Sequence, residues 1–410
     1  MNRSFEKINR LNRSDNLHVY NAFKYTYCYL NMIAIWPLLF KNYNFKTIFT
    51  IIHVSVIIIS LVWQIVFRSC HVYFYAIDLD DQVTFLGPMI FILVSLLKYL
   101  AIIYRSNYIF QSIEHVYTDW SVTQCQEEQD IMITKTEMNR KITIIFSVLM
   151  YASGLFYNFI MPHLIPLLFE SDHQNTSERL IIFPGYNVIK IFDSSPLYEI
   201  TYFFHIIAIF FCFTVLVSTC NLILFLLTHT DGQIDIVTVQ LNTLINDVNK
   251  VKFSHSKMTN IVKNHVRILQ FSDEILNKIL SEICIVEIGA TTILLCVAEF
   301  CSLRFLGKQD FTNTIPYIML FLGLSLNMLI LCYFSEILNS QFIGIGTQLY
   351  MTHWDRIPLN ARKYLILIIN MSQRTKKISA GGVIDLSYMT YLQIIKTGFA
   401  YLQILRASDM

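Results

Sequence analysis

The sequence has few charged residues and none of the common catalytic signatures. Only 15% of its 410 residues are Asp, Glu, Lys or Arg, against roughly 25% in soluble domains, whereas 54% are hydrophobic. It contains no Walker A loop, no Gly-x-Ser-x-Gly and no His-Glu-x-x-His, and its eleven histidines do not cluster at metal-ligand spacing. These absences argue against an enzyme, and we expect neither a cofactor nor a metal.

The nine cysteines are scattered and form no Cys-x-x-Cys pair, so neither a disulfide framework nor a zinc site is indicated. Cys70 and Cys301 fall near the same predicted membrane face, which leaves a bridge between them open. The polar start of the chain lacks the apolar core of a signal peptide. We therefore expect the first apolar segment to direct membrane insertion.

The hydrophobic residues gather in runs long enough to cross a bilayer, which takes about 20 helical residues. The sequence therefore predicts an all-α integral membrane protein with one domain and no internal repeat. Its seven expected spans are Lys46–Phe67, Val83–Tyr104, Ile142–Phe169, Pro196–Leu227, Ile283–Leu303, Ile315–Leu338 and Val383–Leu405.

Positive charges between these spans predict the orientation, because Lys and Arg remain on the cytoplasmic side. With Lys46, the first residue of the first span, counted in the N-terminal segment, 23 Lys and Arg residues fall on one face and 6 on the other. This split predicts a cytoplasmic N-terminus and an extracellular C-terminus. The sequon at Asn175 lies on the predicted outer face, where it is a candidate for N-glycosylation.

Two predicted cytoplasmic regions show helical patterning. Apolar residues recur at helical spacing between charged ones over Leu241–Leu280, which favours helices that extend beneath the membrane. The segment Pro358–Met371 is apolar with basic ends. It would either lie at the membrane interface or pack against copies of itself.

The last span is unusually polar for a membrane helix, because it contains Asp385, Gln393, Lys396 and Gln403. A charge near the bilayer centre costs roughly 2.5–3.5 kcal/mol, so protein or water must cover part of this helix. At 100° per residue, one face of the helix carries small and polar side chains and a single isoleucine. It comprises Gln393, Thr397, Ala400, Ile404 and either Ala407 or Ser408. From these residues alone, both a pore wall and a bundle-core helix remain open.

Inverted topology excludes the G-protein-coupled receptors, whose N-terminus is outside. The segment Tyr391–Arg406 reads YLQIIKTGFAYLQILR, an apolar-Lys step followed by an aromatic-rich stretch that ends in Leu-Arg. With the polar N-terminal segment and the short tail, it resembles the insect odorant receptor family. The co-receptor of that family has a long insertion in its fourth loop, which is missing here. The chain thus resembles an odorant-tuning subunit.

This resemblance implies a ligand-gated, non-selective cation channel that forms a heterotetramer with an odorant co-receptor in the plasma membrane of an olfactory sensory neuron. Its ligands would be small volatile apolar molecules, and its permeating ions would be cations. The last helix would line the tetrameric pore, with Ile404 as an apolar gate. Gln403, Ala400, Ala407 and Ser408 would lie along the same pore wall.

On this basis the chain divides into four parts. Residues 1–45 form a cytoplasmic N-terminal segment, and 46–340 form ligand-binding helices 1–6 with their cytoplasmic extensions. Residues 341–382 form a cytoplasmic anchor region, and 383–410 form the pore helix with a short extracellular tail.

The resemblance also implies an odorant pocket in the outer half of the bundle, between the second, third, fourth and sixth spans. The residues that topology places there are mostly apolar and aromatic, as suits a small volatile ligand. They are Phe85, Met89, Met150, Gly154, Tyr157, Tyr202, His205, Ile209, Tyr317 and Phe321. Each taken alone also fits ordinary helix packing, and His205 fits a hydrogen-bonded core residue better than a metal ligand.

Two other functions remain as alternatives. One is a ligand-gated channel of the gustatory type, although Ala400-Tyr401 is not followed by the Gln-Phe ending typical of that branch. The other is a transporter of small apolar solutes, in which Lys396 with Glu287 or Glu299 would be the coupling charges. A purely structural pairing of Lys396 explains the same residues.

Overall fold

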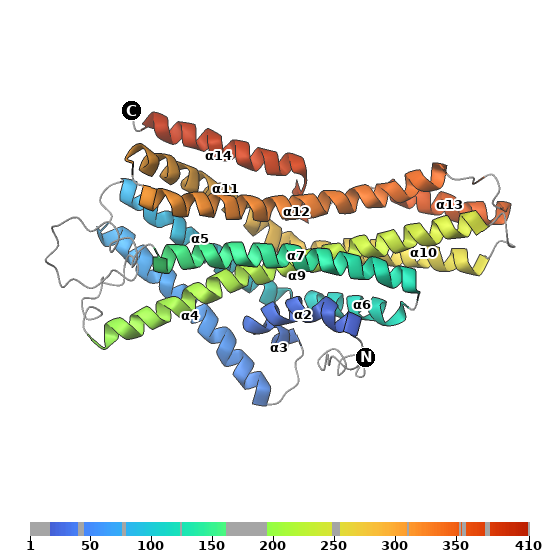
Figure 1. Cartoon of the computed structure of the whole chain (residues 1–410), viewed down its shortest axis with the longest axis horizontal. Coiled ribbons are helices and arrows are strands. Elements are labelled where there is room, and N and C mark those ends of the chain that lie inside the picture. Colours follow the sequence, from blue (N-terminus) through green and yellow to red (C-terminus); the bar gives the residue numbers. More distant parts are fainter. Residues whose placement is uncertain are drawn as a thin grey trace.

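The computed structural model is a bundle of long helices that run along one common axis (Figure 1). It describes residues 17–39, 45–75, 79–123, 125–160, 195–247, 255–309, 311–351, 354, 358–373 and 378–408. Apart from one two-stranded sheet, the regular structure of these residues is helical. The predicted all-α class is confirmed.

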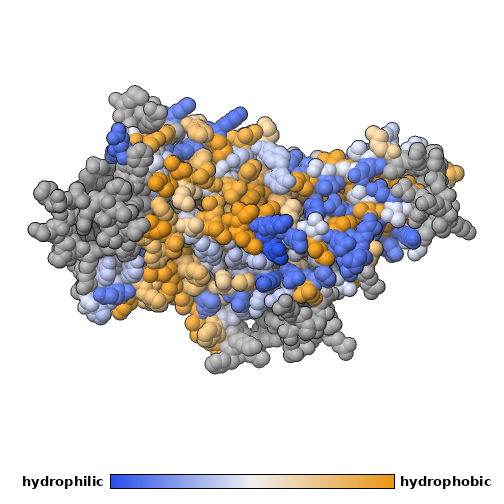
Figure 2. Space-filling view, in the orientation of Figure 1, coloured by the Kyte–Doolittle hydropathy of each residue, from blue (hydrophilic) through white to orange (hydrophobic). Residues whose placement is uncertain are grey.

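Six helices among the described residues are long and apolar enough to cross a bilayer, in agreement with the first six predicted spans. They are α4 (Phe45–Tyr75), α5 (Leu79–Tyr104), α7 (Gln126–Leu155) with its π-helical continuation η1 (Phe156–Ile160), α9 (Leu197–Asp247), α11 (Asn277–Gly307) and α12 (Phe311–Met351). Figure 2 shows hydrophobic residues gathered over one half of the molecule and hydrophilic ones over the other. This division fits a multi-pass membrane protein with a part that extends into water.

The seventh predicted span is also a helix, α14 (Tyr388–Ser408), but it is not among the six apolar ones. Its polar side chains lower its hydropathy. The helix begins at Tyr388 rather than at the predicted Val383. A short hairpin precedes it, formed by β1 (Ser379–Ala380) and β2 (Ile384–Asp385). Asp385 therefore lies in β2, outside α14.

Two consecutive glycines explain this late start. Gly381 and Gly382 have φ of 61° and 72°, a left-handed conformation that glycine adopts without a steric penalty. Gly381 also donates its N–H to the Ser281 carbonyl oxygen at 3.0 Å, and a Cβ atom there would lie 2.7 Å from Cδ1 of Ile285. The glycines thus form a turn docked on α11, and the chain cannot enter a helix directly after them.

The hydrophilic half is built from extensions of the spans and from shorter helices. Helix α9 is 51 residues long and α12 is 41, far more than a bilayer requires. The shorter helices are α2 (Leu17–Met32), α3 (Ile35–Leu39), α6 (Ser106–Val122), α10 (His255–Gln270), the π-helix η4 (Phe271–Leu276) and α13 (Leu359–Ser372). The helices predicted within 241–280 and 358–371 are confirmed.

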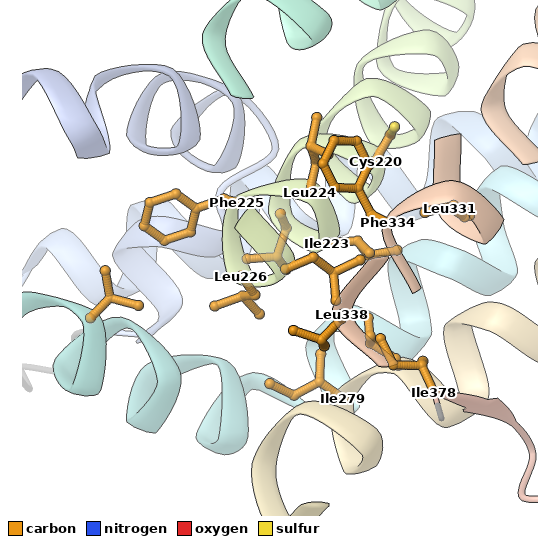
Figure 3. Packing of buried hydrophobic residues seen from close by; sticks show 14 of the residues in the cluster. Cys220, Ile223, Leu224, Phe225, Leu226, Ile279, Leu331, Phe334, Leu338 and Ile378 are labelled. Atoms are coloured by element: carbon orange, nitrogen blue, oxygen red, sulfur yellow. The ribbon is translucent and has the colours of Figure 1, made fainter. Parts of the chain in front are cut away.

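Helix α9 passes through the centre of the bundle. Nineteen consecutive residues from Thr214 to Gly232 are buried, because the helix packs against α2, α4, α5, α7, α10 and α12 and so has neighbours around its whole circumference. Figure 3 shows Ile223 and Leu226 of this helix near Leu338 of α12 and Ile279 of α11. One continuous core therefore joins the apolar half to the hydrophilic half.

A buried ion pair lies within this core. Lys98 of α5 pairs with Glu287 of α11, and the two side chains are only 3% and 4% exposed. The Glu287 carboxylate also accepts hydrogen bonds from Asn327 Nδ2 at 2.7 Å and from Thr291 Oγ1 at 3.1 Å. Each lone pair so occupied offsets part of the cost of placing charge inside an apolar bundle. The network joins α5, α11 and α12.

Two other predictions concern single residues. All nine cysteines are free, so Cys70 and Cys301 are not bridged. Asn175 and the end of the third predicted span lie outside the described residues.

Candidate functional site

An apolar cavity of about 80 Å³ lies between α4, α5, α7 with η1, α9 and α12. Most of its lining side chains are aliphatic or aromatic, and one is charged. The lining residues are Arg68, Pro88, Phe91, Ile92, Met150, Ser153, Tyr157, Asn158, Ile209, Phe213, Pro316, Tyr317, Met319, Leu320, Gly323 and Leu324. An apolar space of this kind suits a small hydrophobic ligand.

Helical spacing explains how α12 and α5 supply two of the walls. On α12 the lining residues include Pro316, Leu320 and Gly323, which share one helix face. On α5 Pro88, Phe91 and Ile92 do the same. Both helices thus contribute a proline to the cavity, and each continues through it.

The α7 wall depends on Gly154. A Cβ atom at this position would lie 2.5 Å from Cε2 of Phe213, so only glycine allows the Phe213 ring to lie this close to α7. Phe213 in turn packs against Phe91, with ring centroids 5.2 Å apart. Gly154 therefore shapes the cavity through Phe213 without lining it.

Polar groups on the same wall bond to the backbone. Ser153 Oγ donates to the carbonyl oxygens of Leu149 at 2.6 Å and Met150 at 3.1 Å. Asn158 Nδ2 donates to the Gly154 carbonyl at 2.8 Å, across the start of the π-helix. These bonds direct the donors into the helix, which keeps this side of the cavity apolar.

Arg68 is the one charged residue among the lining residues, and it is 4% exposed. Its Nε donates to Gln64 Oε1 at 3.5 Å, one helical turn earlier on α4. Gln64 Nε2 lies 2.9 Å from His205 Nδ1 and, as an amide nitrogen, can only donate to it. Gln64 thus links Arg68 of α4 to His205 of α9.

Four of the ten predicted pocket residues line this cavity: Met150, Tyr157, Ile209 and Tyr317. Gly154 and His205 act behind the walls, as described above. The remaining positions lie elsewhere or have no described side chain. Met89 receives a hydrogen bond from Ser69, Tyr202 packs near Trp63 and Phe67, Phe321 packs against the main core, and the side chain of Phe85 lies outside the description.

Sequence reasoning did not find most of the lining residues on α5 and α12, nor Arg68. Two signals were available in the sequence. Pro88 and Pro316 lie inside apolar runs, where proline is rare in helices and marks an irregular backbone. Arg68 lies at the very end of an apolar run, where it counted as an exposed outer charge, although its side chain folds back into the protein.

Helix α14 carries the predicted pore residues. Its buried positions Thr390, Ile394 and Gly398 recur every four residues and face α11 and α12. On other faces Gln393, Lys396, Ala400 and Gln403 are exposed. Ile404, Ala407 and Ser408 lie in the helix, and their side chains are not described.

The contact of α14 with α11 includes an acidic group. A Cβ atom at Gly398 would lie 3.3 Å from both carboxylate oxygens of Glu299, which is 8% exposed. Glycine at this position therefore lets the carboxylate lie directly against the α14 backbone. A side chain there would push the two helices apart.

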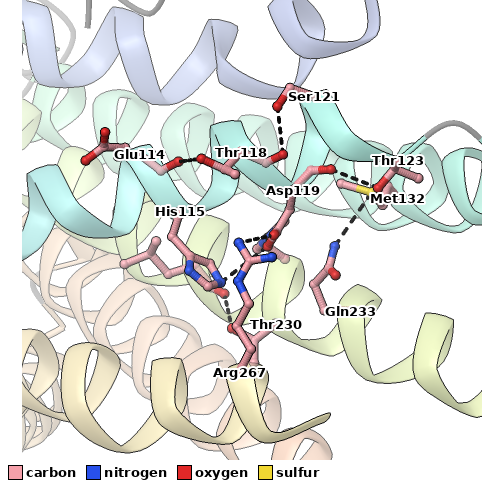
Figure 4. A network of polar contacts seen from close by, with 12 residues as sticks. Glu114, His115, Thr118, Asp119, Ser121, Thr123, Met132, Thr230, Gln233 and Arg267 are labelled. Atoms are coloured by element: carbon pink, nitrogen blue, oxygen red, sulfur yellow. Dashed lines mark hydrogen bonds and ion pairs between the residues drawn. The ribbon is translucent and has the colours of Figure 1, made fainter. Parts of the chain in front are cut away.

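A second, polar cavity of about 200 Å³ lies in the hydrophilic half, between α6, α7, α9 and α10. Asp119 of α6 is at its wall and is 6% exposed (Figure 4). Its carboxylate accepts a hydrogen bond from His229 Nε2 at 3.0 Å and forms an ion pair with Arg267, whose Nη2 lies 2.5 Å away. The His115 Nε2 lies 3.3 Å from the same carboxylate. Asp119 thus joins α6 to both α9 and α10.

The pKa values of this cluster are shifted by burial and by the charges of its members. Burial raises the pKa of Asp119, but the hydrogen bond from His229 and the positive charges around it outweigh burial, so the pKa lies below its ordinary value. Burial is the main reason that the pKa of His115 is lowered to about 4; Arg267 and His229 act in the same direction, and Asp119 partly opposes them. At neutral pH His115 is therefore uncharged and Asp119 is ionised. Among the described residues no group of three or more His, Cys, Asp or Glu side chains is placed to hold a metal ion.

Similar sequences and structures agree on one family. Residues 78–399, most of the chain, match the family model described as 7tm Odorant receptor. Odorant receptor 83a of Drosophila melanogaster is 27% identical over 130 residues, 32% of this chain and 28% of that protein. Odorant receptor 19a of the same species is 21% identical over 238 residues, 56% of this chain and 59% of that protein. The matched parts span less than two thirds of these relatives.

The similarity in structure extends over nearly the whole chain. The insect olfactory receptor OR5 from Machilis hrabei, solved in complex with eugenol, superposes with a TM-score of 0.75 at 14% identity and covers 96% of this chain and 99% of that one. The same receptor without a named ligand gives 0.72, with 95% and 98% covered. At this identity the likeness shows a shared fold. Together with the family match over residues 78–399, it shows that the chain belongs to the 7tm odorant receptor family, that of the insect odorant receptors.

Proposed function

We propose that this chain is the odorant-tuning subunit of an odorant-gated, non-selective cation channel. A small volatile molecule binds in the apolar cavity, and the pore opens together with an odorant co-receptor in a heterotetramer. The site of action is the plasma membrane of an olfactory sensory neuron. The observation that carries this proposal is the cavity itself, an apolar space lined by five helices that are long and apolar enough to cross a bilayer.

Binding in this cavity relies on dispersion and on the removal of apolar surface from water. The aromatic rings of Phe91, Phe213 and Tyr317 are among the lining groups that such a ligand would contact. Burial of a ligand surface is worth about 25 cal/mol per Å², so a molecule of ten heavy atoms gains enough for micromolar affinity only if nearly all of it is enclosed. Shape therefore decides which volatiles fit.

The exposed face of α14 supports the pore part of the proposal. Gln393, Ala400 and Gln403 are exposed in the part of the chain that the structure describes. A polar helix face is stable in a membrane only against water or other protein. In a tetramer this face would line the conduction path, with Ile404 as the apolar gate and Ala407 and Ser408 beyond it.

Helix α12 connects the cavity to α14. Leu324 lines the cavity, and the next residue, Ser325, contacts Tyr391 of α14. A ligand shifts the closed–open equilibrium only by its differential affinity for the two states. A small movement of the α12 residues that line the cavity, as the pore opens, would supply that difference in affinity.

The transporter alternative gains no support from the charges that it requires. Glu287 pairs with Lys98 rather than with Lys396, and no ion pair of Lys396 occurs among the described residues.

Whole-cell currents test both functions in cells that express the chain with and without an odorant co-receptor, under a panel of volatiles. Volatile-evoked current only in the pair is expected. Uptake of a volatile against its gradient without ion current would overturn the proposal.

A further inference from the structure

The polar cavity of the hydrophilic half has no part in the proposed function, and its size suits a second ligand. At about 200 Å³ it is larger than the apolar cavity. One water molecule needs only roughly 10–15 Å³ on the same measure, so the cavity has room for an organic molecule of several heavy atoms. It lies in the half of the molecule that extends into water, where a dissolved molecule can reach it (Figure 2).

The charges on the walls of this cavity are unequal. Asp119 and Arg267 form an ion pair with each other, and His229 also donates to Asp119 (Figure 4). Glu128 of α7 lines the same cavity, and no ion pair of this carboxylate occurs in the part of the chain that the structure describes. His115 is uncharged at neutral pH. Two carboxylates against one guanidinium therefore leave one negative charge, and it lies on Glu128.

Gln240 of α9 places a second acceptor beside this carboxylate. Its Nε2 donates to Glu128 Oε1 at 2.6 Å, and because a carboxylate only accepts, the nitrogen of the amide must face Glu128. The amide oxygen therefore lies on the other side of the group. This Gln240 Oε1 is buried and accepts no hydrogen bond from the described residues. A buried acceptor without a donor is costly, so the oxygen calls for a donor from outside the chain.

Another part of the wall is aliphatic. Val122 of α6, Ile236 of α9 and Ile268 of α10 line the same cavity. Ile236 and Gln240 are four residues apart and so share one face of α9. The walls thus combine a carboxylate and an amide oxygen with hydrocarbon surface. A molecule with positively charged N–H donors at one end and a short hydrocarbon chain at the other matches both.

We propose that this cavity is a binding site for a small alkylammonium ion from the aqueous phase. The N–H groups of the ammonium would donate to the Glu128 carboxylate and to Gln240 Oε1, while the alkyl chain lies against Ile236 and Ile268. The hydrogen bond from Gln240 orients the carboxylate before the ligand enters. An anion fits worse, because Arg267 already has Asp119 as its partner and Glu128 would repel the anion.

Thermal unfolding of the full chain in detergent tests the site with probes of four carbon atoms. n-Butylammonium is compared with 1-butanol, which lacks the charge, and with butyrate, which has the opposite charge, at constant ionic strength. A ligand that binds only the folded state raises its stability, so n-butylammonium should raise the unfolding midpoint, with a half-maximal effect on the order of 1 mM. 1-Butanol and butyrate should need at least about 10-fold higher concentrations.

Two substitutions assign the effect to the cavity. Glu128→Gln keeps the size of the side chain and an acceptor for Gln240 but removes the charge, so the half-maximal n-butylammonium concentration should rise about 10-fold or more. Gln240→Met removes the second acceptor and should raise it roughly 3- to 10-fold. Glu127→Gln is the matched control, because Glu127 is the exposed neighbour of Glu128 and does not line the cavity. Its response should equal that of the unaltered chain.

Each midpoint shift is measured against the same variant without the amine, so a less stable variant still reports on binding. Equal shifts in the unaltered chain and in Glu128→Gln would overturn the site, because the effect would then arise elsewhere on the chain or in the detergent. A larger effect of butyrate than of n-butylammonium would overturn it and assign the cavity to an anion instead. No shift with n-butylammonium up to about 100 mM would also overturn it.

This inference goes beyond the proposed odorant-gated function and does not depend on it. The two cavities lie in different halves of the molecule, and the unfolding measurement needs neither a volatile nor a co-receptor. Failure of the alkylammonium site would leave the volatile-evoked currents as expected. Absence of those currents would leave the result with n-butylammonium unchanged.

Discussion

The Ser325 Oγ and the Tyr391 hydroxyl lie 2.8 Å apart and join α12, a wall of the cavity, to α14. Ser325 directly follows the lining residue Leu324. We expect Tyr391→Phe to shift the odorant concentration for half-maximal current by roughly 2- to 10-fold, the range of one neutral hydrogen bond, without loss of surface expression. Concentration–response curves with the co-receptor measure this shift.

A double-mutant cycle gives the control. Ser325→Ala removes the same bond from its other end, so the two substitutions together should change the response no more than either alone. Fully additive shifts would mean that the bond does not transmit the effect of the ligand.

The apolar gate predicts a change in basal current. An apolar constriction closes a pore by excluding water, so Ile404→Thr should raise the current that flows without any ligand. Recordings before ligand application, normalised to surface expression, measure it. Phe399→Thr is the comparison, because Phe399 is exposed on a different face of α14. Equal basal currents in Ile404→Thr and the unaltered chain would rule out Ile404 as the gate.

The contact between Gly154 and Phe213 predicts retuning by a single methyl group. Gly154→Ala places its Cβ atom within 2.5 Å of the Phe213 ring, so the ring must move and the cavity must change shape. We expect an altered rank order of volatile responses, and Gly154→Trp should abolish them. Gly289→Ala is the control, because no atom lies within 4 Å of a Cβ atom there. An unchanged rank order in Gly154→Ala would remove Gly154 from the determinants of tuning.

The Asp119 cluster predicts a loss of stability outside the membrane. Asp119→Asn keeps the size of the side chain but leaves Arg267 and His229 facing a neutral amide. The change should cost roughly 1–3 kcal/mol, because Arg267 is partly exposed and water screens part of the effect. Thermal unfolding in detergent should show a lower midpoint. Glu114→Gln, on the same helix, should leave the midpoint unchanged.

The same cluster predicts how stability depends on pH. The pKa of His115 lies at about 4, below the ordinary value of 6.5 that applies to the unfolded chain. Between these values the unfolded chain binds more protons than the folded one, so stability is full above about pH 6.5 and falls as the pH drops toward 4. The lowered pKa of Asp119 acts in the same direction at still lower pH. Unfolding midpoints across this range should decline, and His115→Gln should flatten the decline between pH 6.5 and 4.

Most helices could be predicted from the sequence because each depends on a local property, a run of apolar residues or a helical period. The start of α14 could not, because the hydrophobic run continues through Val383 and Ile384 while the turn at Gly381 depends on docking against Ser281 and Ile285. That docking joins residues about a hundred positions apart.

The sequence indicated at which depth along the spans a pocket could lie, but not which side chains would line it. Met150 and Tyr317 line the cavity, and their position along their spans indicated this depth; the rotation of each helix about its axis decides which other residues line it. Tyr202, for example, lies at a suitable depth but turns toward Trp63 and Phe67. The Arg68–Gln64–His205 network joins α4 to α9, and no local sequence pattern predicts such a contact.

The Lys98–Glu287 ion pair also has a consequence for biosynthesis. Glu287 follows Lys98 by almost 190 residues, so at a synthesis rate of 5–20 residues per second the ribosome needs roughly 10–40 s to reach it. During that interval the lysine is already part of an inserted span while its counter-ion does not yet exist. Because a lysine without its partner is costly in lipid, we expect α5 to stay beside water or the insertion machinery until α11 has been made.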